Sequence, residues 1–380
     1  MPTSPRLFLF DYLRAFIILM VVLHHSALAY AVHGVSWWYI RDSMTNPLFD
    51  IFVLINDVFM MPVLFFIAGY FAWPSLKRKG FFEFLKDKFF RLILPFAFGI
   101  LFLGPVTGYI RHVAKTGAEE SYLHYWFSTY FTKEFGHFHF WFLSSLFIFF
   151  AVFCIVYYLV PDLAEMRRRP MDEHSTAENS IPFGTLLTFA AATGILFFVA
   201  TLFFEDDQWT NLSNILIFQP TRTILYASYF CLGILGFHKG WFISNGTHRF
   251  LPVWLFSMFI LAVGIIIFKA TLPVPSSVVS KFLYALLHSF LCLSVFVVLT
   301  DIFRRNFNKP SNMKQQLSLN AYGIYLIHMN FVVLFQFVFH NFILFSFLKF
   351  ALVSILGFLM SYIICEYGLR RAPLLRKVLY

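Results

Sequence analysis

The chain has 380 residues, of which 59% are hydrophobic and 13% are charged, whereas roughly 25% of residues are charged in a typical soluble domain. This composition excludes an ordinary soluble globular protein and predicts a membrane protein. The formal net charge of +10 does not indicate nucleic-acid binding, because the basic residues lie mostly between apolar runs, where they suit an anionic membrane surface. We therefore expect a lipid bilayer and no nucleic acid among the partners.

Apolar runs recur along the whole chain, and ten of them approach the roughly 20 residues that a helix needs to cross a bilayer. The sequence therefore predicts an all-α, polytopic membrane bundle of about ten transmembrane helices. The runs cover residues 10–31, 50–73, 91–109, 139–160, 183–204, 219–237, 250–269, 280–301, 317–340 and 343–366.

The basic residues are distributed unevenly over the connections between these runs. Alternate connections, together with both chain ends, carry 20 of the 29 Lys and Arg residues, and the opposite set carries six. Cytoplasmic connections are enriched in Lys and Arg. Both termini are therefore predicted to be cytoplasmic.

The connections indicate one membrane-embedded domain over residues 1–380. Residues 161–182 have the polar composition of a flexible cytoplasmic loop. Residues 110–138 form the longest predicted external segment and are expected to cover the outer mouth of a site. Four cysteines, at 154, 231, 292 and 365, lie far apart within apolar runs and are interpreted as buried apolar side chains, and we expect no metal site.

The first run has a competing interpretation as a signal peptide. Arg6, an apolar run and the small residues of Ser-Ala-Leu-Ala resemble such a segment. Acidic, basic and imidazole groups make a poor signal-peptide core, so a first transmembrane helix is the favoured interpretation.

This first run contains Asp11, Arg14, His24 and His25, which are costly within a membrane and usually face a bundle interior. At about 100° per residue, Arg14 and His25 share one helical stripe with Asp11, whereas His24 is turned away. A rise of about 1.5 Å per residue places Arg14 about 16 Å from His25, at the cytoplasmic rim. In the alternative interpretation Arg14 extends to the lipid headgroups, Asp11 neutralises it and the histidines bind neighbouring helices.

Polar residues of the same kind mark later spans. Lys88 and Arg91 lie one turn apart at the cytoplasmic start of the third span, where they equally suit a positive-inside anchor. His139 and Trp141 begin the fourth span, while Tyr325 and His328 lie one turn apart in the ninth, where tyrosines also occur as interfacial or core residues. Glu366 ends the last span, and Arg370 can pair with it four residues later.

These residues carry a resemblance to the acyltransferase family 3 membrane proteins, and in particular to the glucans biosynthesis protein C branch. Arg14 and His25, separated by ten residues, match the arginine and histidine of that family's first span. Lys88-Phe89-Phe90-Arg91 matches its Arg-x-x-Arg element, with lysine in the first position, which loses a bidentate contact to phosphate. The segments "FFIAGYF", "FWFLSSL" and "YGIYLIH" also resemble the family.

The resemblance implies transfer of an acyl group, of the acetyl or succinyl class, from cytoplasmic acyl-CoA to a hydroxyl of a cell-envelope glycan on the outer side. It also implies a multi-pass protein of a bacterial-type cytoplasmic membrane, with acyl-CoA as co-substrate and no permanently bound cofactor. Arg14, Lys88 and Arg91 suit the phosphates of coenzyme A, and Asp11 would hold Arg14.

A histidine at mid-membrane depth suits proton abstraction from the acceptor hydroxyl, which makes His25 the predicted general base and His24 the second catalytic candidate. Because there is no Gly-x-Ser-x-Gly motif, direct attack on the thioester is favoured over an acyl-enzyme on Ser26, Tyr325 or His24. The residues His139, Trp141, Tyr325, His328 and Glu366 are supporting or acceptor-side candidates. A multi-span transporter or proton-coupled exporter is the alternative function, since buried ionisable groups also form relays.

Overall fold

The computed structural model describes residues 7–33, 37–117, 119–160, 181–242 and 250–379. The loop expected at 161–182 lies outside the described residues except for its last two positions. The chain divides into two compact units built from non-consecutive segments, so the single domain inferred from the sequence stays a prediction. The first unit is Met1–Arg14, Asp57–Asp87 and Leu146–Lys314, and the second unit is Ala15–Asn56, Lys88–Ser145 and Gln315–Tyr380.

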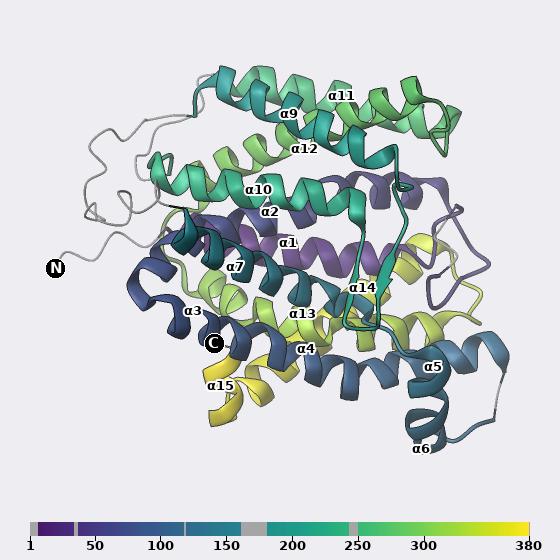
Figure 1. Cartoon of the computed structure of the whole chain (residues 1–380). Coiled ribbons are helices and arrows are strands. Elements are labelled where there is room, and N and C mark those ends of the chain that lie inside the picture. Colours follow the sequence, from purple (N-terminus) through teal and green to yellow (C-terminus); the bar gives the residue numbers. More distant parts are fainter. Residues whose placement is uncertain (1–6, 34–36, 118, 161–180, 243–249, 380) are drawn as a thin grey trace. The chain divides into compact units, whose positions relative to one another are not determined.

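Helices make up most of the described chain (Figure 1). They are α1 (Phe8–Ala27), α2 (Pro47–Lys79), α3 (Phe81–Lys88), α4 (Leu94–Phe98), α5 (Gly104–Thr116), α6 (Tyr122–His124), α7 (Trp141–Leu159), α9 (Phe183–Thr201), α10 (Pro220–His238), α11 (Leu251–Thr271), α12 (Val278–Phe307), α13 (Asn312–Phe339), α14 (Ser346–Ile364) and α15 (Pro373–Leu379). Four π-helical segments, η1 (Phe89–Ile93), η2 (Gly99–Leu103), η3 (Tyr125–Glu134) and η5 (Cys365–Leu369), and the 3₁₀ turn η4 (Phe138–Phe140) adjoin them.

The predicted all-α membrane fold is confirmed. Within the described residues, nine helical segments are long and apolar enough to cross a membrane. The remaining expected span, at 219–237, is helical as α10 but is not among these nine. The third span is longer than expected, because helical structure continues from Phe81 to Thr116.

Within the first unit, α12 packs against α9 and α11, and α9 also packs against α10. Helices α2 and α10 approach each other closely at two glycines. A Cβ atom at Gly69 would lie 2.0 Å from the carbonyl oxygen of Phe230, and one at Gly233 would lie 2.2 Å from that of Phe66. Small residues at these two positions therefore permit backbone-to-backbone packing, as is common between membrane helices.

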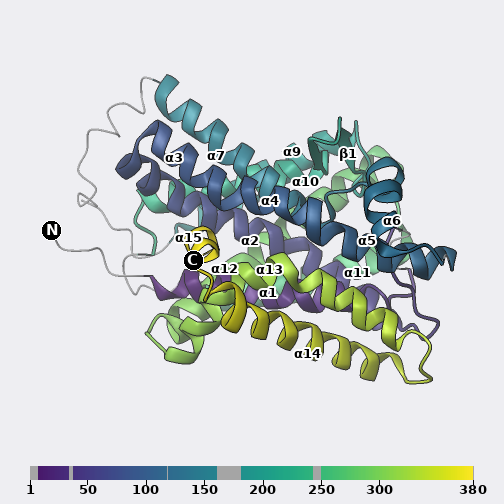
Figure 2. The same cartoon turned by 90° about the horizontal axis from the view of Figure 1, so that it is seen from below.

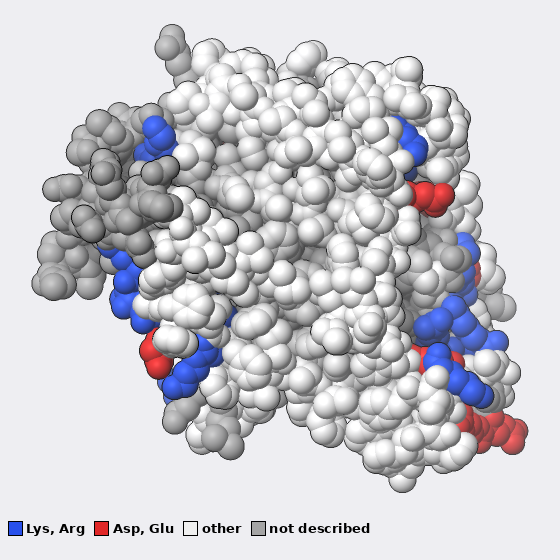
Figure 3. Space-filling view, in the orientation of Figure 1, with Lys and Arg blue, Asp and Glu red and all other residues white. Residues whose placement is uncertain are grey.

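The outer helices of the first unit expose apolar side chains. Phe256, Phe259 and Ile267 of α11 and Leu196 of α9 are all exposed. Over α9 and α11, at the top of Figure 3, the visible surface is almost entirely uncharged. Such faces suit lipid contact.

The four cysteines are not all buried as expected, since Cys231 of α10 is exposed.

One short hairpin interrupts the helical pattern between α9 and α10. Strands β1 (Thr210–Leu212) and β2 (Leu216–Phe218) pair antiparallel, with Asn211 opposite Ile217. Ser213 and Asn214 both have positive φ, at 51° and 57°. Two successive residues of this kind are typical of a type I′ turn, whose twist matches that of the strands.

In the second unit, Pro95 explains one contact of helix α13. A proline within a helix lacks the N–H that would bond the carbonyl four residues earlier, here that of Arg91. The hydroxyl of Tyr322 in α13 donates to that carbonyl oxygen instead. The sequence of η1 and α4 thus leaves an acceptor that a side chain of another helix satisfies.

The same rule applies at Pro105, which leaves the carbonyl of Leu101 without its helical donor. The indole N–H of Trp126 donates to that oxygen at 3.0 Å, and the hydroxyl of Tyr130 donates to the neighbouring carbonyl of Ile100 at 2.7 Å. The π-helical turn η2 therefore anchors η3, the segment that contains both aromatic residues.

Helices α13 and α14 lie side by side in the second unit (Figure 2), where Gly357 of α14 packs against Val332 of α13. A fully buried ion pair lies at the start of α14. Lys349 Nζ donates to both carboxylate oxygens of Asp42, at 2.9 and 2.7 Å, and also to the carbonyl oxygen of His340. This pairing satisfies a charge that would otherwise be very costly to bury.

Candidate active site

His25 lies in α1, and its imidazole ring is stacked between two aromatic rings of the second unit. The Trp38 ring lies 5.5 Å away by centroid at an interplanar angle of 13°, and the His328 ring lies 5.2 Å away at 17°. Stacking of this kind restricts the orientation of a ring. His25 itself is only half-buried, so the fixed ring is not sealed within the protein.

The hydrogen bonds of His328 define which ring nitrogens of His25 and His328 carry protons. Its Nδ1 lies 2.8 Å from the carbonyl oxygen of Tyr325 and 3.2 Å from that of Ile324. Carbonyl oxygens only accept, so Nδ1 of His328 carries the proton and Nε2 of the neutral ring is an acceptor. His25 Nδ1 lies 2.9 Å from that Nε2 and therefore donates to it. With both rings neutral, this leaves Nε2 of His25 with an available lone pair.

Gln336 of α13 connects the remaining parts of this arrangement. Its Nε2 donates to the carbonyl oxygens of His25, at 2.9 Å, and Ser26, at 3.2 Å. Its Oε1 accepts from the indole N–H of Trp38 at 3.1 Å. One amide thus holds the end of α1 and the stacking tryptophan. Sequence reasoning missed both Trp38 and Gln336.

His139 and Tyr325, two of the supporting candidates, are in contact with each other and with His328. The Tyr325 hydroxyl donates to the carbonyl oxygen of His139, and His139 Nε2 donates to the carbonyl oxygen of Leu326 at 3.2 Å. The His139 ring lies 5.0 Å from that of His328. Trp141 begins α7 nearby in sequence and accepts, through its backbone carbonyl, a bond from Ser144.

His24 has different surroundings from His25. Its ring lies 5.5 Å from that of His25 at 77°, edge to face. Its Nδ1 is buried, and no hydrogen-bond partner for that atom occurs among the described residues. The structure therefore gives a defined orienting partner to His25 and none to Nδ1 of His24.

The three donor-binding candidates belong to different units. Arg14, in the first unit, lies 3.7 Å from Asp11, and both side chains are partly exposed. Lys88 and Arg91 belong to the second unit, where Lys88 is half-buried and Arg91 is exposed. Their joint use by one ligand stays a prediction.

Glu366 is hydrogen-bonded to two other side chains. Its Oε2 accepts from Asn320 Nδ2 at 2.6 Å and from Arg370 Nη1 at 2.7 Å. The pairing with Arg370 is the alternative that the spacing of four residues had left open. Glu366 joins η5 to α13, and no contact places it beside His25.

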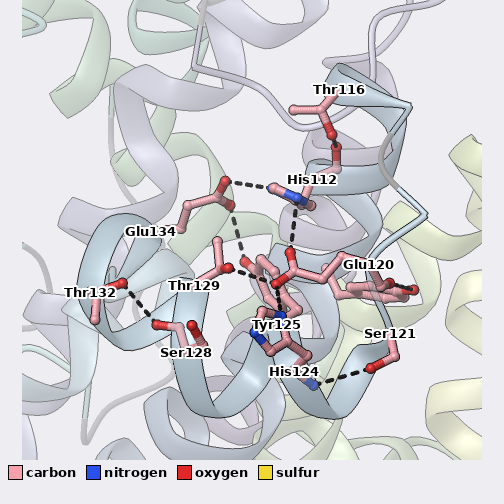
Figure 4. Close-up of polar contacts among 11 residues, drawn as sticks. His112, Thr116, Glu120, Ser121, His124, Tyr125, Ser128, Thr129, Thr132 and Glu134 are labelled. Carbon is pink, nitrogen blue, oxygen red and sulfur yellow. Dashed lines mark hydrogen bonds and ion pairs between the residues drawn. The ribbon is translucent and has the colours of Figure 1, made fainter.

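A second histidine-containing site lies between α5 and η3. Figure 4 shows His112 between two carboxylates, with Nδ1 2.9 Å from Glu134 Oε1 and Nε2 3.2 Å from Glu120 Oε2. The hydroxyl of Tyr125 donates to Glu134 Oε2 at 3.0 Å, and that of Thr129 donates to Glu120 Oε1 at 2.8 Å. We call this group the His112 clasp.

The clasp explains why most of residues 110–138, expected as an external loop, are helical. Hydrogen bonds from Thr129 and, to a lesser extent, His124 outweigh the opposing effect of burial and hold the pKa of Glu120 below its usual value. Within the described ranges, no three His, Cys, Asp or Glu residues form a group suited to a metal ion. The clasp joins α5 to Glu120 and η3 through direct side-chain contacts.

A half-buried imidazole with an oriented Nδ1–H and a free Nε2, in a multi-span helical protein, can accept a proton from a hydroxyl group.

Comparison with known proteins assigns the family. A family model described as an acyltransferase domain matches residues 9–366. The chain therefore belongs to the acyltransferase family 3 proteins. It is similar to proteins named glucans biosynthesis protein C from Salmonella gallinarum, Salmonella schwarzengrund and Salmonella typhi, each 25% identical over 236 residues. The match covers 62% of this chain and 59% of the length of those relatives.

Proposed function

We propose that this membrane acyltransferase moves an acetyl- or succinyl-class acyl group from cytoplasmic acyl-CoA to a hydroxyl of a cell-envelope glycan on the outer side. Its location would be a bacterial-type cytoplasmic membrane. The relatives named for glucan biosynthesis support a glycan acceptor. The observation that carries the catalytic part is the hydrogen bond between His25 Nδ1 and His328 Nε2.

In the proposed reaction, Nε2 of His25 removes the proton from the acceptor hydroxyl while the hydroxyl oxygen attacks the thioester carbonyl. The new carbon–oxygen bond forms an ester, the carbon–sulfur bond breaks, and coenzyme A leaves as a thiolate that takes up a proton. His328 acts as a positioning residue, because it accepts from Nδ1 of His25 and so keeps Nε2 free.

Two contacts support direct transfer over an acyl-enzyme. Ser26 is fully buried, and its hydroxyl donates to the carbonyl oxygen of Val22 at 2.8 Å. The hydroxyl of Tyr325, also buried, donates to a backbone carbonyl. Among the described residues, neither hydroxyl is hydrogen-bonded to a base that would activate it as a nucleophile. His24 is the remaining acyl-carrier candidate, and we expect His24→Ala to keep substantial activity.

The donor's phosphates are proposed to contact Arg14, Lys88 and Arg91, which carry the positive charge that suits phosphate. A charge-assisted hydrogen bond contributes roughly 1.5 to 3 kcal/mol, so Arg14→Ala should weaken coenzyme A binding by about tenfold or more. Calorimetry on the folded variant measures this effect. Unchanged affinity would remove Arg14 from the donor site.

A transfer assay separates this function from a transporter. Purified protein in detergent is given acetyl-CoA or succinyl-CoA, with and without a linear gluco-oligosaccharide, and both thiol release and acceptor mass are followed. We expect acceptor-dependent thiol release and an increase in acceptor mass by one acyl group. If no acyl-CoA is consumed, and reconstituted vesicles instead move the oligosaccharide across the membrane, the exporter alternative is correct.

A further inference from the structure

A buried group of charged and polar side chains in the first unit has no role in the reaction described above. We call it the Arg222 cluster and define it as Asp57, Asp206, Arg222, Tyr284 and His288. Its members come from α2, the connection between α9 and β1, α10 and α12. Ionisable side chains buried among membrane helices are rare and mark functional sites.

Arg222 is the centre of this cluster. Its Nη2 lies 3.1 Å from Asp57 Oδ2 and 2.9 Å from Asp206 Oδ2. Its Nη1 contacts Nε2 of His288, and the hydroxyl of Tyr284 donates to the same Asp206 oxygen as Arg222. Arg222 therefore contacts side chains of three other elements.

Three polar atoms of the cluster have no hydrogen-bond partner in the described part of the chain: Asp206 Oδ1, Arg222 Nε and His288 Nδ1. The side chains of Asp206 and Arg222 are only 9% and 6% exposed, and His288 is buried. A buried polar group without a partner costs roughly 1 to 3 kcal/mol, and more when charged. A cluster that served packing alone would be expected to satisfy these atoms, so they point to a binding role.

The three atoms differ in their hydrogen-bonding chemistry: Asp206 Oδ1 accepts, whereas Arg222 Nε donates, as does His288 Nδ1, because Nε2 of that ring accepts from Arg222. A hydroxyl group can do both, so it matches the acceptor and the donors together. The cluster contains two carboxylates, which disfavour an anion, and the guanidinium disfavours a cation. Neutral hydroxyl groups are therefore the ligand chemistry that fits.

The protein does not enclose the cluster completely at one carboxylate, because the side chain of Asp57 is 50% exposed. Arg222 lies in the first turn of α10, and Asp206 lies in the connection that precedes β1. The distribution of basic residues predicts that these ends of the helices face outward, where a cell-envelope acceptor would approach.

We propose that the Arg222 cluster is a binding subsite for the sugar hydroxyls of the acceptor glycan. This proposal rests on the proposed function, in which a glycan receives the acyl group. It assigns Asp206, Arg222 and Asp57 to acceptor binding and leaves proton transfer to His25.

Binding of a linear gluco-oligosaccharide, measured by calorimetry without acyl-CoA, tests the proposal. Loss of one hydrogen bond to a charged group should weaken binding by about tenfold or more in Asp206→Asn and in Asp57→Asn. Glu205→Gln is the matched control, since Glu205 is an exposed carboxylate adjacent to Asp206 and outside the cluster. The control should bind like the native protein.

The half-exposed Asp57 keeps the test decisive if Asp206→Asn fails to fold. In steady-state assays, Asp57→Asn should raise the KM for the oligosaccharide and leave the KM for acyl-CoA unchanged. Native affinity in folded Asp57→Asn, or no oligosaccharide binding by the native protein, would overturn the proposal. Consumption of acyl-CoA is a separate readout, and its absence would count against the proposed function itself.

Discussion

The second unit contains two half-buried histidines whose partners differ in kind. His25 is hydrogen-bonded to another imidazole, which is in turn oriented by backbone carbonyls. His112 lies between two carboxylates. The carboxylates engage both ring nitrogens of His112, which suits a structural fastening. A neutral imidazole partner engages only one nitrogen of His25, and the other stays available for chemistry.

This comparison predicts that changes at the His25 site reduce the rate with little effect on stability, and that changes at the His112 clasp do the reverse.

The buried pair of Lys349 and Asp42 is an ion pair in the same unit, and we expect its loss to affect stability more than the loss of either histidine. Lys349→Met removes the cation and leaves the carboxylate of Asp42 buried without it. Breaking a buried pair in this way costs roughly 3 to 5 kcal/mol. We expect a large loss of thermal stability or of folded protein, measured by size-exclusion chromatography after heating. The double variant Lys349→Met with Asp42→Asn should recover part of the lost stability. Equal instability of the single and the double variant would contradict the ion-pair explanation.

His328→Ala removes the acceptor that orients His25. A lost buried hydrogen bond of about 1 to 3 kcal/mol corresponds to a rate reduction of roughly 5- to 150-fold. His328→Gln should restore part of the rate, because an amide can donate to the Tyr325 carbonyl and accept from His25. The readout is kcat for acyl transfer at saturating substrates. Equal rates for the two variants would show that orientation of His25 is not the role of His328.

His112→Ala should leave the transfer rate within about twofold of native, because the clasp does not contribute to proton transfer. It should lower the thermal midpoint, since it leaves Glu120 and Glu134 without their shared partner and frees η3. Thermal unfolding followed by tryptophan fluorescence measures the shift. A loss of activity with an unchanged midpoint would reverse the proposed roles of the two histidine sites.

Glu120 gives the clasp a pH dependence. Its pKa is lowered in the folded protein, so its stabilising contribution is fully present above the ordinary glutamate pKa of about 4.3 and is lost as pH falls through the folded value. Native protein should lose more stability between about pH 5 and pH 3 than Glu120→Gln, by a small margin. Glu119→Gln is the control, because Glu119 is exposed. The same acid sensitivity in native protein and Glu120→Gln would exclude this contribution.

The sequence predicted the features that depend on local composition. Apolar length identified the spans, and the helical period placed Arg14 and His25 on one stripe of α1. The role of His328 was only partly foreseen, since its spacing from Tyr325 was visible but its contact with His25 crosses 303 positions of the chain. Trp38 and Gln336 gave no local signal at all.

The structural features that the sequence did not predict have one cause in common. Residues 110–138 were expected as an external segment, and their helical structure was not foreseen, because the contacts that fold them join Glu120 and Glu134 to His112 of α5. Arg222 was visible as a charge within a span, but its partners come from three other elements. Long-range polar contacts are specified by the tertiary fold, and hydropathy and periodicity do not encode them.

The most direct test of the central claim compares transfer rates of His25→Ala, His24→Ala and His112→Ala in matched detergent preparations. Removing a positioned general base costs about 10² to 10⁴ in rate. We expect that loss in His25→Ala, with coenzyme A affinity and thermal midpoint nearly native, and substantial activity in the other two. Full activity in folded His25→Ala would contradict the assignment of His25 as the base.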